Sequence, residues 1–166
     1  MRVGFGFDAH RLMPGRPLVL AGCRIPFDRG LEGYSDADVV AHALIDAILG
    51  GAAMGDCGTM FPAGTPEFAG ADSVELLRRA VERVVESGLR IGNVDCTIVA
   101  ERPALAPHIA EMRKKIAQAC GVATERCSIK AKHTEGMGFT GEGIGMAAFA
   151  TATLLEENEV GSLHAR

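Results

Sequence analysis

The stretch from Ser35 to His42 constrains the fold of this chain more than any other. Ser35 followed by Asp38 forms a capping box, which predicts that a helix starts here. Asp36 and Asp38 would then lie in the first turn, where the positive end of the helix dipole favours carboxylates. His42 follows one turn later and precedes an apolar run. We therefore predict a largely buried helix from about Asp36 to about Gly50, with a histidine near its start.

A candidate partner for His42 lies far upstream. The alternation that begins at Val3 predicts a strand that ends at Asp8, and His10 lies two residues beyond Asp8, so both side chains would share one face. Asp8, His10 and His42 would form a three-ligand set with one open position, as in catalytic zinc sites. Asp46, one helical turn after His42, would orient the imidazole as an acceptor. The alternative is that each of these residues is an ordinary polar group.

The composition is that of a soluble globular chain. Its 166 residues fit a single domain, and a net charge of −4 argues against a nucleic-acid-binding surface. There is neither an apolar run of membrane-spanning length nor a signal-peptide pattern. The five cysteines are scattered and odd in number, which indicates reduced core residues in a cytoplasmic protein. We expect one domain over residues 1–156 and a flexible tail over residues 157–166.

The remaining periodicities predict an α+β fold. Asp72 and Glu75 form a second capping box that starts an amphipathic helix. Helices are predicted between Asp72 and Gly88 and between Pro107 and Gly121, strands over 18–23, 93–100, 128–133 and 146–155, and loops over 24–34 and 55–70. The order predicts helices on one face of a mixed sheet. Because the other face is also apolar in part, we expect an oligomer.

A second polar group lies where the predicted strand 128–133 ends. Lys132, His133, Thr134 and Glu135 lead into a glycine-rich turn, and such residues suit a phosphate with a hard divalent cation. An ordinary polar turn fits equally well. Residues 100–106 would offer backbone groups to a base, or would simply connect a strand to a helix. The residues alone leave two classes open: a metal-dependent enzyme acting on a phosphorylated metabolite, and a metal-stabilised binding protein.

Motifs spread in order over nearly the whole chain make a further comparison possible. They lie at residues 6–10, 35–39, 42–44, 55–58, 61–62, 70–73, 92–95, 130–135 and 138–141. Together they resemble the 2-C-methyl-D-erythritol 2,4-cyclodiphosphate synthases of the non-mevalonate isoprenoid pathway. The resemblance implies a ferredoxin-like α+β subunit in a homotrimer, with active sites between subunits. It also implies a CMP-releasing phosphorus–oxygen lyase, whose substrate 4-diphosphocytidyl-2-C-methyl-D-erythritol 2-phosphate cyclises when its 2-phosphate attacks its own β-phosphate.

The resemblance also implies roles for single residues. Asp8, His10 and His42 would bind Zn²⁺, and Glu135 of the adjoining subunit would help to hold a second cation, Mg²⁺ or Mn²⁺. The residues implied at the substrate are Tyr34, Ser35, Asp56, Gly58, Phe61, Pro62, Ala63, Gly64, Thr65, Ala100, Pro103, Ala104, Leu105, Ala106, Lys132, His133, Thr134, Phe139 and Glu142. Among them, residues 100–106 would line the cytosine pocket, and residues 61–65 would cover the substrate. Tyr34, Lys132, His133 and Glu135 would be catalytic.

Some positions depart from the family pattern. Tyr34 and His133 stand where the family usually has a histidine and a threonine. Glu142 and Ile144 replace an arginine and a glutamate near the trimer cavity, which argues against an anionic regulator there. These departures motivate an alternative, a diverged member that binds a cytidine nucleotide or a phosphorylated metabolite with little or no cyclase activity. A third hypothesis is a zinc hydrolase with Glu135 as its base.

Overall fold

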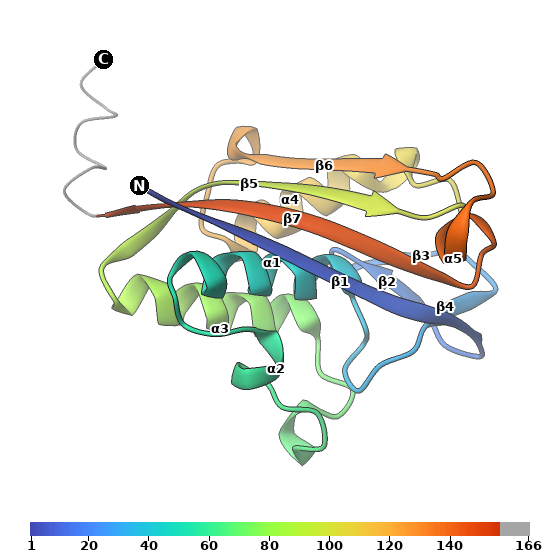
Figure 1. Cartoon of the computed structure of the whole chain (residues 1–166), viewed down its shortest axis with the longest axis horizontal. Coiled ribbons are helices and arrows are strands. Elements are labelled where there is room, and N and C mark those ends of the chain that lie inside the picture. Colours follow the sequence, from blue (N-terminus) through green and yellow to red (C-terminus); the bar gives the residue numbers. More distant parts are fainter. Residues whose placement is uncertain (157–166) are drawn as a thin grey trace.

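The computed structural model describes residues 1–156 and contains one mixed sheet with helices against one of its faces (Figure 1). Across the sheet the strands are β4 (Arg29–Leu31), β1 (Arg2–Pro14), β7 (Gly145–Glu156), β5 (Leu89–Val99) and β6 (Cys127–Lys132). The main helices are α1 (Val39–Gly51), α3 (Ser73–Glu86) and α4 (Ile109–Ala119). The predicted mixed α+β fold is confirmed. The tail predicted over residues 157–166 lies outside the described residues.

The strand directions explain why the sheet is mixed. Strand β1 pairs antiparallel with β4 and β7, and β7 pairs antiparallel with β5. Strand β5 runs parallel to β6, so the chain must cross over between them. The short helix η2 (Ala106–His108) and α4 make this crossover. The segment before η2 therefore lies at the end of β5, beside the end of β6.

The start of α1 differs from the prediction. The helix begins at Val39 with Asp38 as its N-cap, so Ser35 does not cap it and no acidic residue lies in its first turn. The buried Asp38 carboxylate accepts hydrogen bonds from the N–H groups of Val40 and Ala41. It also accepts from the N–H groups of Ala21 and Gly22, at 2.9 and 2.7 Å. Burial raises the pKa of Asp38 to about 6, against the opposing effect of these donors.

Several other element boundaries also differ. Strand β1 continues past Asp8 to Pro14, so His10 lies within it rather than in a loop. The segment predicted as one strand over 18–23 forms a separate hairpin of β2 (Leu18–Leu20) and β3 (Cys23–Ile25). Two predicted loops contain short elements: β4 lies within 24–34, and α2 (Cys57–Met60) with η1 (Pro66–Phe68) lies within 55–70. The turns after α4 and β6 hold η3 (Thr124–Arg126) and α5 (Gly138–Gly141).

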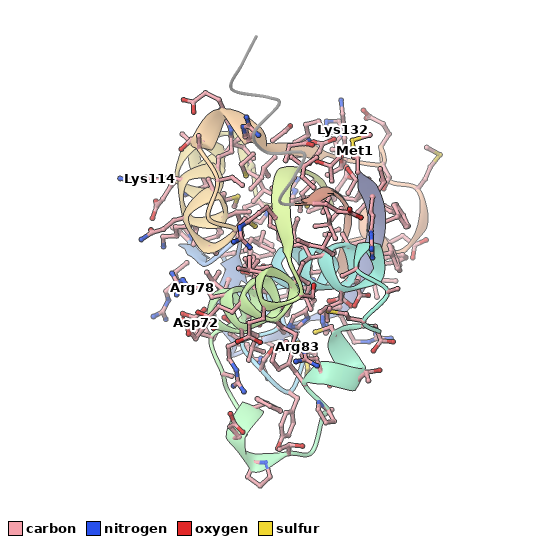
Figure 2. All side chains as sticks on the ribbon, turned by 90° about the vertical axis from the view of Figure 1, so that its left-hand side faces the viewer. Met1, Asp72, Arg78, Arg83, Lys114 and Lys132 are labelled. Carbon is pink, nitrogen blue, oxygen red and sulfur yellow. The ribbon has the colours of Figure 1, made fainter. Side chains whose placement is uncertain are left out.

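Helix α3 agrees with its prediction at the N-terminus. Asp72 is the N-cap and accepts from the N–H groups of Val74 and Glu75. The Glu75 side chain forms an ion pair with Arg78. Figure 2 shows Arg78 on α3 and Lys114 on α4 pointing away from the helical layer. The apolar sides of both helices face inward, where Leu77 and other aliphatic side chains are fully buried.

Strand β1 lies directly against α1 because two of its residues are glycines. A Cβ atom added at Gly4 would lie 1.8 Å from the Ala47 carbonyl oxygen, and one at Gly6 would lie 1.9 Å from the Ala43 carbonyl oxygen. The two backbones are therefore in contact, which no larger residue would allow. Alternate residues of a strand share a face, so Asp8 follows Gly4 and Gly6 on the side toward α1.

The opposite face of the sheet carries exposed aromatic side chains. Val3, Phe5 and Phe7 on β1 and Phe149 on β7 are between 41% and 64% exposed. The Phe149 ring lies 5.0 Å from the Phe7 ring and 6.4 Å from the Phe5 ring, centroid to centroid. In the single chain this apolar patch is open to solvent. No helix among residues 1–156 is long and apolar enough to cross a bilayer. All five cysteines are free, as expected.

Candidate active site

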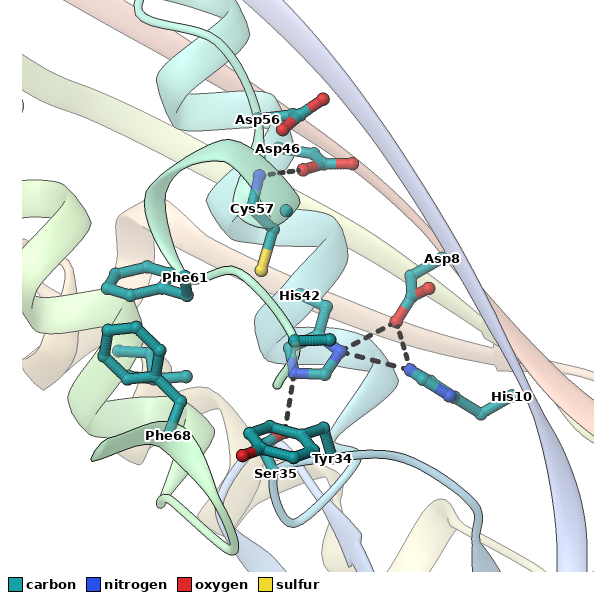
Figure 3. A pocket seen from close by; sticks show the side chains of 13 residues that line it. Asp8, His10, Tyr34, Ser35, His42, Asp46, Asp56, Cys57, Phe61 and Phe68 are labelled. Carbon is teal, nitrogen blue, oxygen red and sulfur yellow. Dashed lines mark hydrogen bonds and ion pairs between the residues drawn. The ribbon is translucent and has the colours of Figure 1, made fainter. Parts of the chain in front are cut away.

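Three side chains from two elements converge on one point (Figure 3). Asp8 and His10 project from β1, and His42 projects from α1, one turn after the Asp38 cap. Asp8 Oδ2 lies 2.9 Å from His10 Nε2 and 2.9 Å from His42 Nδ1. The two imidazole nitrogens are 3.2 Å apart. The predicted trio therefore forms a group able to hold a metal ion.

The chemistry of the trio fits a cation. One carboxylate oxygen and two imidazole nitrogens meet at 2.9 to 3.2 Å, close to the ~3.3 Å that separates neighbouring ligand atoms of a tetrahedral zinc ion. Burial by itself would raise the pKa of Asp8, but its hydrogen bonds and charge interactions with His10 and His42 prevail and lower that pKa well below its usual range. His10 also has a hydrogen bond with the backbone of Glu32. Asp8 is therefore held as a carboxylate.

The second ring nitrogen of His42 is held by hydroxyl groups rather than by Asp46. Its Nε2 lies 3.1 Å from Ser35 Oγ and 3.0 Å from Ser73 Oγ. The Asp46 Oδ1 atom instead accepts from the Cys57 N–H at 2.8 Å, which attaches the segment after α1 to the helix. Sequence reasoning missed Ser73. Ser73 belongs to the motif at residues 70–73, which is shared with the family, but the motif does not indicate which residue its hydroxyl contacts.

The trio lines a cavity of about 360 Å³. The structure brings ten predicted residues to it: Asp8, His10, Tyr34, Ser35, His42, Asp46, Asp56, Gly58, Phe61 and Ala63. Sequence reasoning did not assign the other three lining residues, Cys57, Phe68 and Leu76. They come from α2, η1 and α3, so their approach depends on packing between segments. Burial raises the pKa of the Cys57 thiol to about 12, which keeps this neighbour of the trio protonated at neutral pH.

The far wall of the cavity is a folded loop. Asp56 caps α2 by accepting from the Thr59 N–H at 2.7 Å. Phe61 and Phe68 are buried and pack edge to face, with ring centroids 5.4 Å apart. The Arg79 guanidinium lies over both rings. Pro62, Gly64 and Thr65 belong to the same loop, between α2 and η1.

A second group of predicted residues lines a separate cavity of about 610 Å³. Its walls are the turn after β5 and the end of β6, which the parallel pairing places side by side. Seven predicted residues lie there: Ala100, Pro103, Ala104, Leu105, Ala106, Lys132 and His133. Phe27, Glu101, Arg102 and Ala131 complete the lining. The two cavities share no lining residue.

The remaining predicted residues lie in the turn after β6. His133 Nδ1 is 3.1 Å from Glu135 Oε1, and both side chains are exposed. The Thr134 N–H donates to Glu101 at 3.3 Å. Phe139 is 46% exposed, and Glu142 lines a further cavity of about 160 Å³. Neither His133 nor Glu135 lines the cavity of the Asp8 trio within this chain.

The fold and the site define an α+β protein with an Asp–His–His centre at the wall of a loop-bordered cavity. A comparison with protein families goes further: the YgbB family model matches residues 1–155, so the chain belongs to that family. The 2-C-methyl-D-erythritol 2,4-cyclodiphosphate synthase of Moorella thermoacetica is 54% identical over 156 residues, which cover 94% of this chain and 96% of that enzyme. The chain is thus a member of a family of enzymes.

Solved structures agree with this assignment. The bifunctional IspDF from Campylobacter jejuni matches 93% of this chain with a TM-score of 0.90 and 39% identity, and the match covers 42% of that longer protein. A 2C-methyl-D-erythritol-2,4-cyclodiphosphate synthase solved in a CDP-bound form matches 93% of this chain and 100% of its own, with a TM-score of 0.86 and 32% identity. The alternative of a binding protein without enzymatic activity is not favoured by these relatives.

Proposed function

We propose that this enzyme converts 4-diphosphocytidyl-2-C-methyl-D-erythritol 2-phosphate into 2-C-methyl-D-erythritol 2,4-cyclodiphosphate and CMP. An oxygen of the 2-phosphate forms a bond to the β-phosphorus, and the bond from that phosphorus to the bridging oxygen of CMP breaks. The cyclic diphosphate product is an intermediate in the biosynthesis of isoprenoid precursors. The observation that carries the proposal is the convergence of Asp8, His10 and His42 beside a cavity, in a chain 54% identical to a synthase of this name.

Catalysis of this reaction depends on neutralising and aligning the two phosphate groups, because the substrate supplies its own nucleophile. Both reacting groups are anionic, so repulsion and misalignment form the barrier. Asp8, His10 and His42 would hold Zn²⁺, and Glu135 of a neighbouring subunit would help to hold Mg²⁺ or Mn²⁺. When bound, the two cations supply charge neutralisation and an in-line alignment of the phosphates. Lys132 would add a positive charge beside them.

Donor side chains would complete the site. Tyr34 lines the cavity of the trio, where its hydroxyl can donate to a phosphate oxygen. His133, whose Nδ1 lies 3.1 Å from Glu135 Oε1, would do the same from an adjoining subunit. Ser35 would lie beside the phosphates. Asp56 and Gly58 would contact the ribose or the sugar alcohol.

The second cavity would bind the cytosine. Ala100, Ala104 and Ala106 line this cavity with small side chains, which would leave room for a base beside the backbone of the segment. A related synthase was solved with CDP, which supports a nucleotide site in this fold. Residues 61–65 would cover the substrate. Thr134, Phe139 and Glu142 would border it from the turn after β6.

We further propose that the enzyme is a homotrimer with active sites between subunits. The nucleotide cavity and the trio share no lining residue, although a single substrate must reach both. A neighbouring subunit would supply the missing half of each site. The patch of Val3, Phe5, Phe7 and Phe149 is an apolar surface of the kind that subunit contacts cover.

The trimer gives a testable prediction. Light scattering after size-exclusion chromatography should give three times the chain mass of 17.4 kDa for the wild-type protein. Phe5→Glu places a charge in the patch and should shift the protein to single chains. The matched control is Ala110→Glu, which adds the same charge at an exposed position of α4. A wild-type monomer, or a Phe5→Glu trimer as stable as the control, would contradict this assembly.

The function is tested by phosphorus NMR of the purified, zinc-loaded enzyme with its diphosphocytidyl substrate and Mg²⁺. We expect the cyclic diphosphate and CMP to appear in equal amounts. An opened, hydrolysed product would instead favour a zinc hydrolase. If zinc-loaded wild-type protein released no CMP, the cyclase assignment would be wrong, and the binding protein suggested by Tyr34 and His133 would replace it.

A further inference from the structure

The hydrogen bonds on the far side of His42 carry an inference beyond metal ligation. His42 Nε2 points away from Asp8, toward Ser35 Oγ at 3.1 Å and Ser73 Oγ at 3.0 Å. Ser73 is fully buried, and its hydroxyl lies 3.0 Å from that of Ser35. A hydroxyl can donate or accept. These contacts alone therefore leave open which nitrogen of the imidazole carries the proton.

Asp36 decides the direction of these hydrogen bonds. The Ser73 hydroxyl donates to Asp36 Oδ1, and the Ser73 N–H donates to Asp36 Oδ2 at 3.2 Å. An ionised carboxylate only accepts, and a serine hydroxyl has a single proton. The proton of Ser73 is therefore directed to Asp36, and Ser73 Oγ presents lone pairs to its other neighbours. The hydrogen bond between the two serines then uses the single proton of Ser35, so Ser35 Oγ also presents only lone pairs to His42. His42 Nε2 must therefore be the nitrogen that donates.

The consequence appears at the other nitrogen of His42. A neutral imidazole protonated at Nε2 has its free lone pair at Nδ1. That atom lies 2.9 Å from Asp8 Oδ2 and 3.2 Å from His10 Nε2. The side chain is thus held in the tautomer that can bind a metal ion at the point where the trio converges.

We propose that Ser73 and Asp36 are positioning residues, which hold His42 in its Nε2-protonated tautomer and so raise the zinc affinity of the Asp8–His10–His42 centre. This inference rests on the metal site of the proposed function. Partners of this kind typically contribute about 10- to 100-fold to metal affinity. Asp36 lies before α1 and Ser73 begins α3. The chain of hydrogen bonds from Asp36 through Ser73 to His42, here called the relay, therefore joins the starts of two helices to the proposed metal centre.

The test compares zinc affinities by competition with a chromophoric chelator, using the full-length protein. Ser73→Ala should weaken zinc binding about 10- to 100-fold. The matched control is Asp72→Ala. Asp72 is adjacent and caps the same helix through the Val74 and Glu75 N–H groups. Its removal perturbs the start of α3 but leaves the Ser73 hydroxyl in place, so its zinc affinity should stay within about twofold of the wild type.

A second variant keeps the test decisive if Ser73→Ala folds poorly. Asp36→Ala frees the Ser73 proton to point at His42, so it should weaken zinc binding by a similar factor. The double variant should lose no more than the larger single loss, because the relay acts as a unit. Nitrogen NMR of histidine-labelled, zinc-loaded protein gives a direct signature: a protonated His42 Nε2 in the wild type, with a shifted resonance in Ser73→Ala.

Three outcomes would overturn the proposal. They are wild-type zinc affinity in both Ser73→Ala and Asp36→Ala, an equal loss in Asp72→Ala, and an unprotonated His42 Nε2 in the zinc-loaded wild type. A wild-type protein that binds no zinc would instead contradict the metal site of the proposed function. The chelator assay on the wild type therefore separates the two failures.

Discussion

Replacing His42 by alanine is expected to lower the rate of cyclic diphosphate formation by about a thousandfold or more, because the variant lacks one of the three proposed zinc ligands beside the proposed phosphate site. Asp8 and His10 would remain 2.9 Å apart, but two ligands hold zinc poorly. Two quantities are measured: the rate of CMP release, by phosphorus NMR, and the zinc content of the purified protein. Both should fall.

The control for this variant is His108→Ala, which removes an imidazole from the start of α4, outside the cavity of the trio. It should retain wild-type zinc content and nearly wild-type activity. A His42→Ala protein that loses zinc but keeps its activity would show that the metal has a structural role only. A His42→Ala protein that keeps both its zinc and its activity would show that His42 neither binds the metal nor takes part in the reaction.

The second large effect concerns folding. Asp38→Ala is expected to lower the free energy of unfolding by roughly 3 to 5 kcal/mol, the sum of a lost N-cap and of orphaned N–H groups. The carboxylate serves the first turn of α1 through Val40 and Ala41, and the β2–β3 hairpin through Ala21 and Gly22. Alanine leaves all four donors without this partner, in a region fully shielded from water at Asp38. Urea unfolding followed by circular dichroism measures the loss.

Asp72→Ala provides the comparison for Asp38→Ala. Asp72 is also an N-cap, but it is exposed and its carboxylate accepts only within its own helix. Its loss should cost only about 1 kcal/mol. If the two variants lost equal stability, the contacts of Asp38 with the hairpin would contribute nothing, and its role would be reduced to capping.

The sequence predicted the centre of the site because its signals are local. Asp8 and His10 are two residues apart on a strand, so their shared face follows from strand geometry alone. His42 precedes an apolar helical run, which placed it near a helix start. Only the relative placement of β1 and α1 needed the fold. Periodicity predicted both elements, the residue types suggested the three-ligand set, and the resemblance to a family implied the same set as zinc ligands.

The errors arose where distant segments decide a local choice. Ser35 and Asp38 both fit the pattern of an N-cap, and the hairpin N–H groups of Ala21 and Gly22 favour Asp38. Strands of three residues, such as β2 and β4, are too short to show a period. Ser73 reaches His42 only because α3 packs beside α1, so no spacing along the chain indicates this contact.

The glycines at positions 4 and 6 have a consequence for the geometry of the proposed metal centre. Most pairs of elements are separated by side chains, which can change rotamer and let the elements drift by fractions of an ångström. Here the carbonyl groups of Ala43 and Ala47 rest on the β1 backbone itself. The spacing between Asp8 and His42 is therefore set by direct van der Waals contact between the two backbones, with no intervening side chain. A larger residue at Gly4 or Gly6 would push β1 away from α1 and would therefore separate Asp8 from His42.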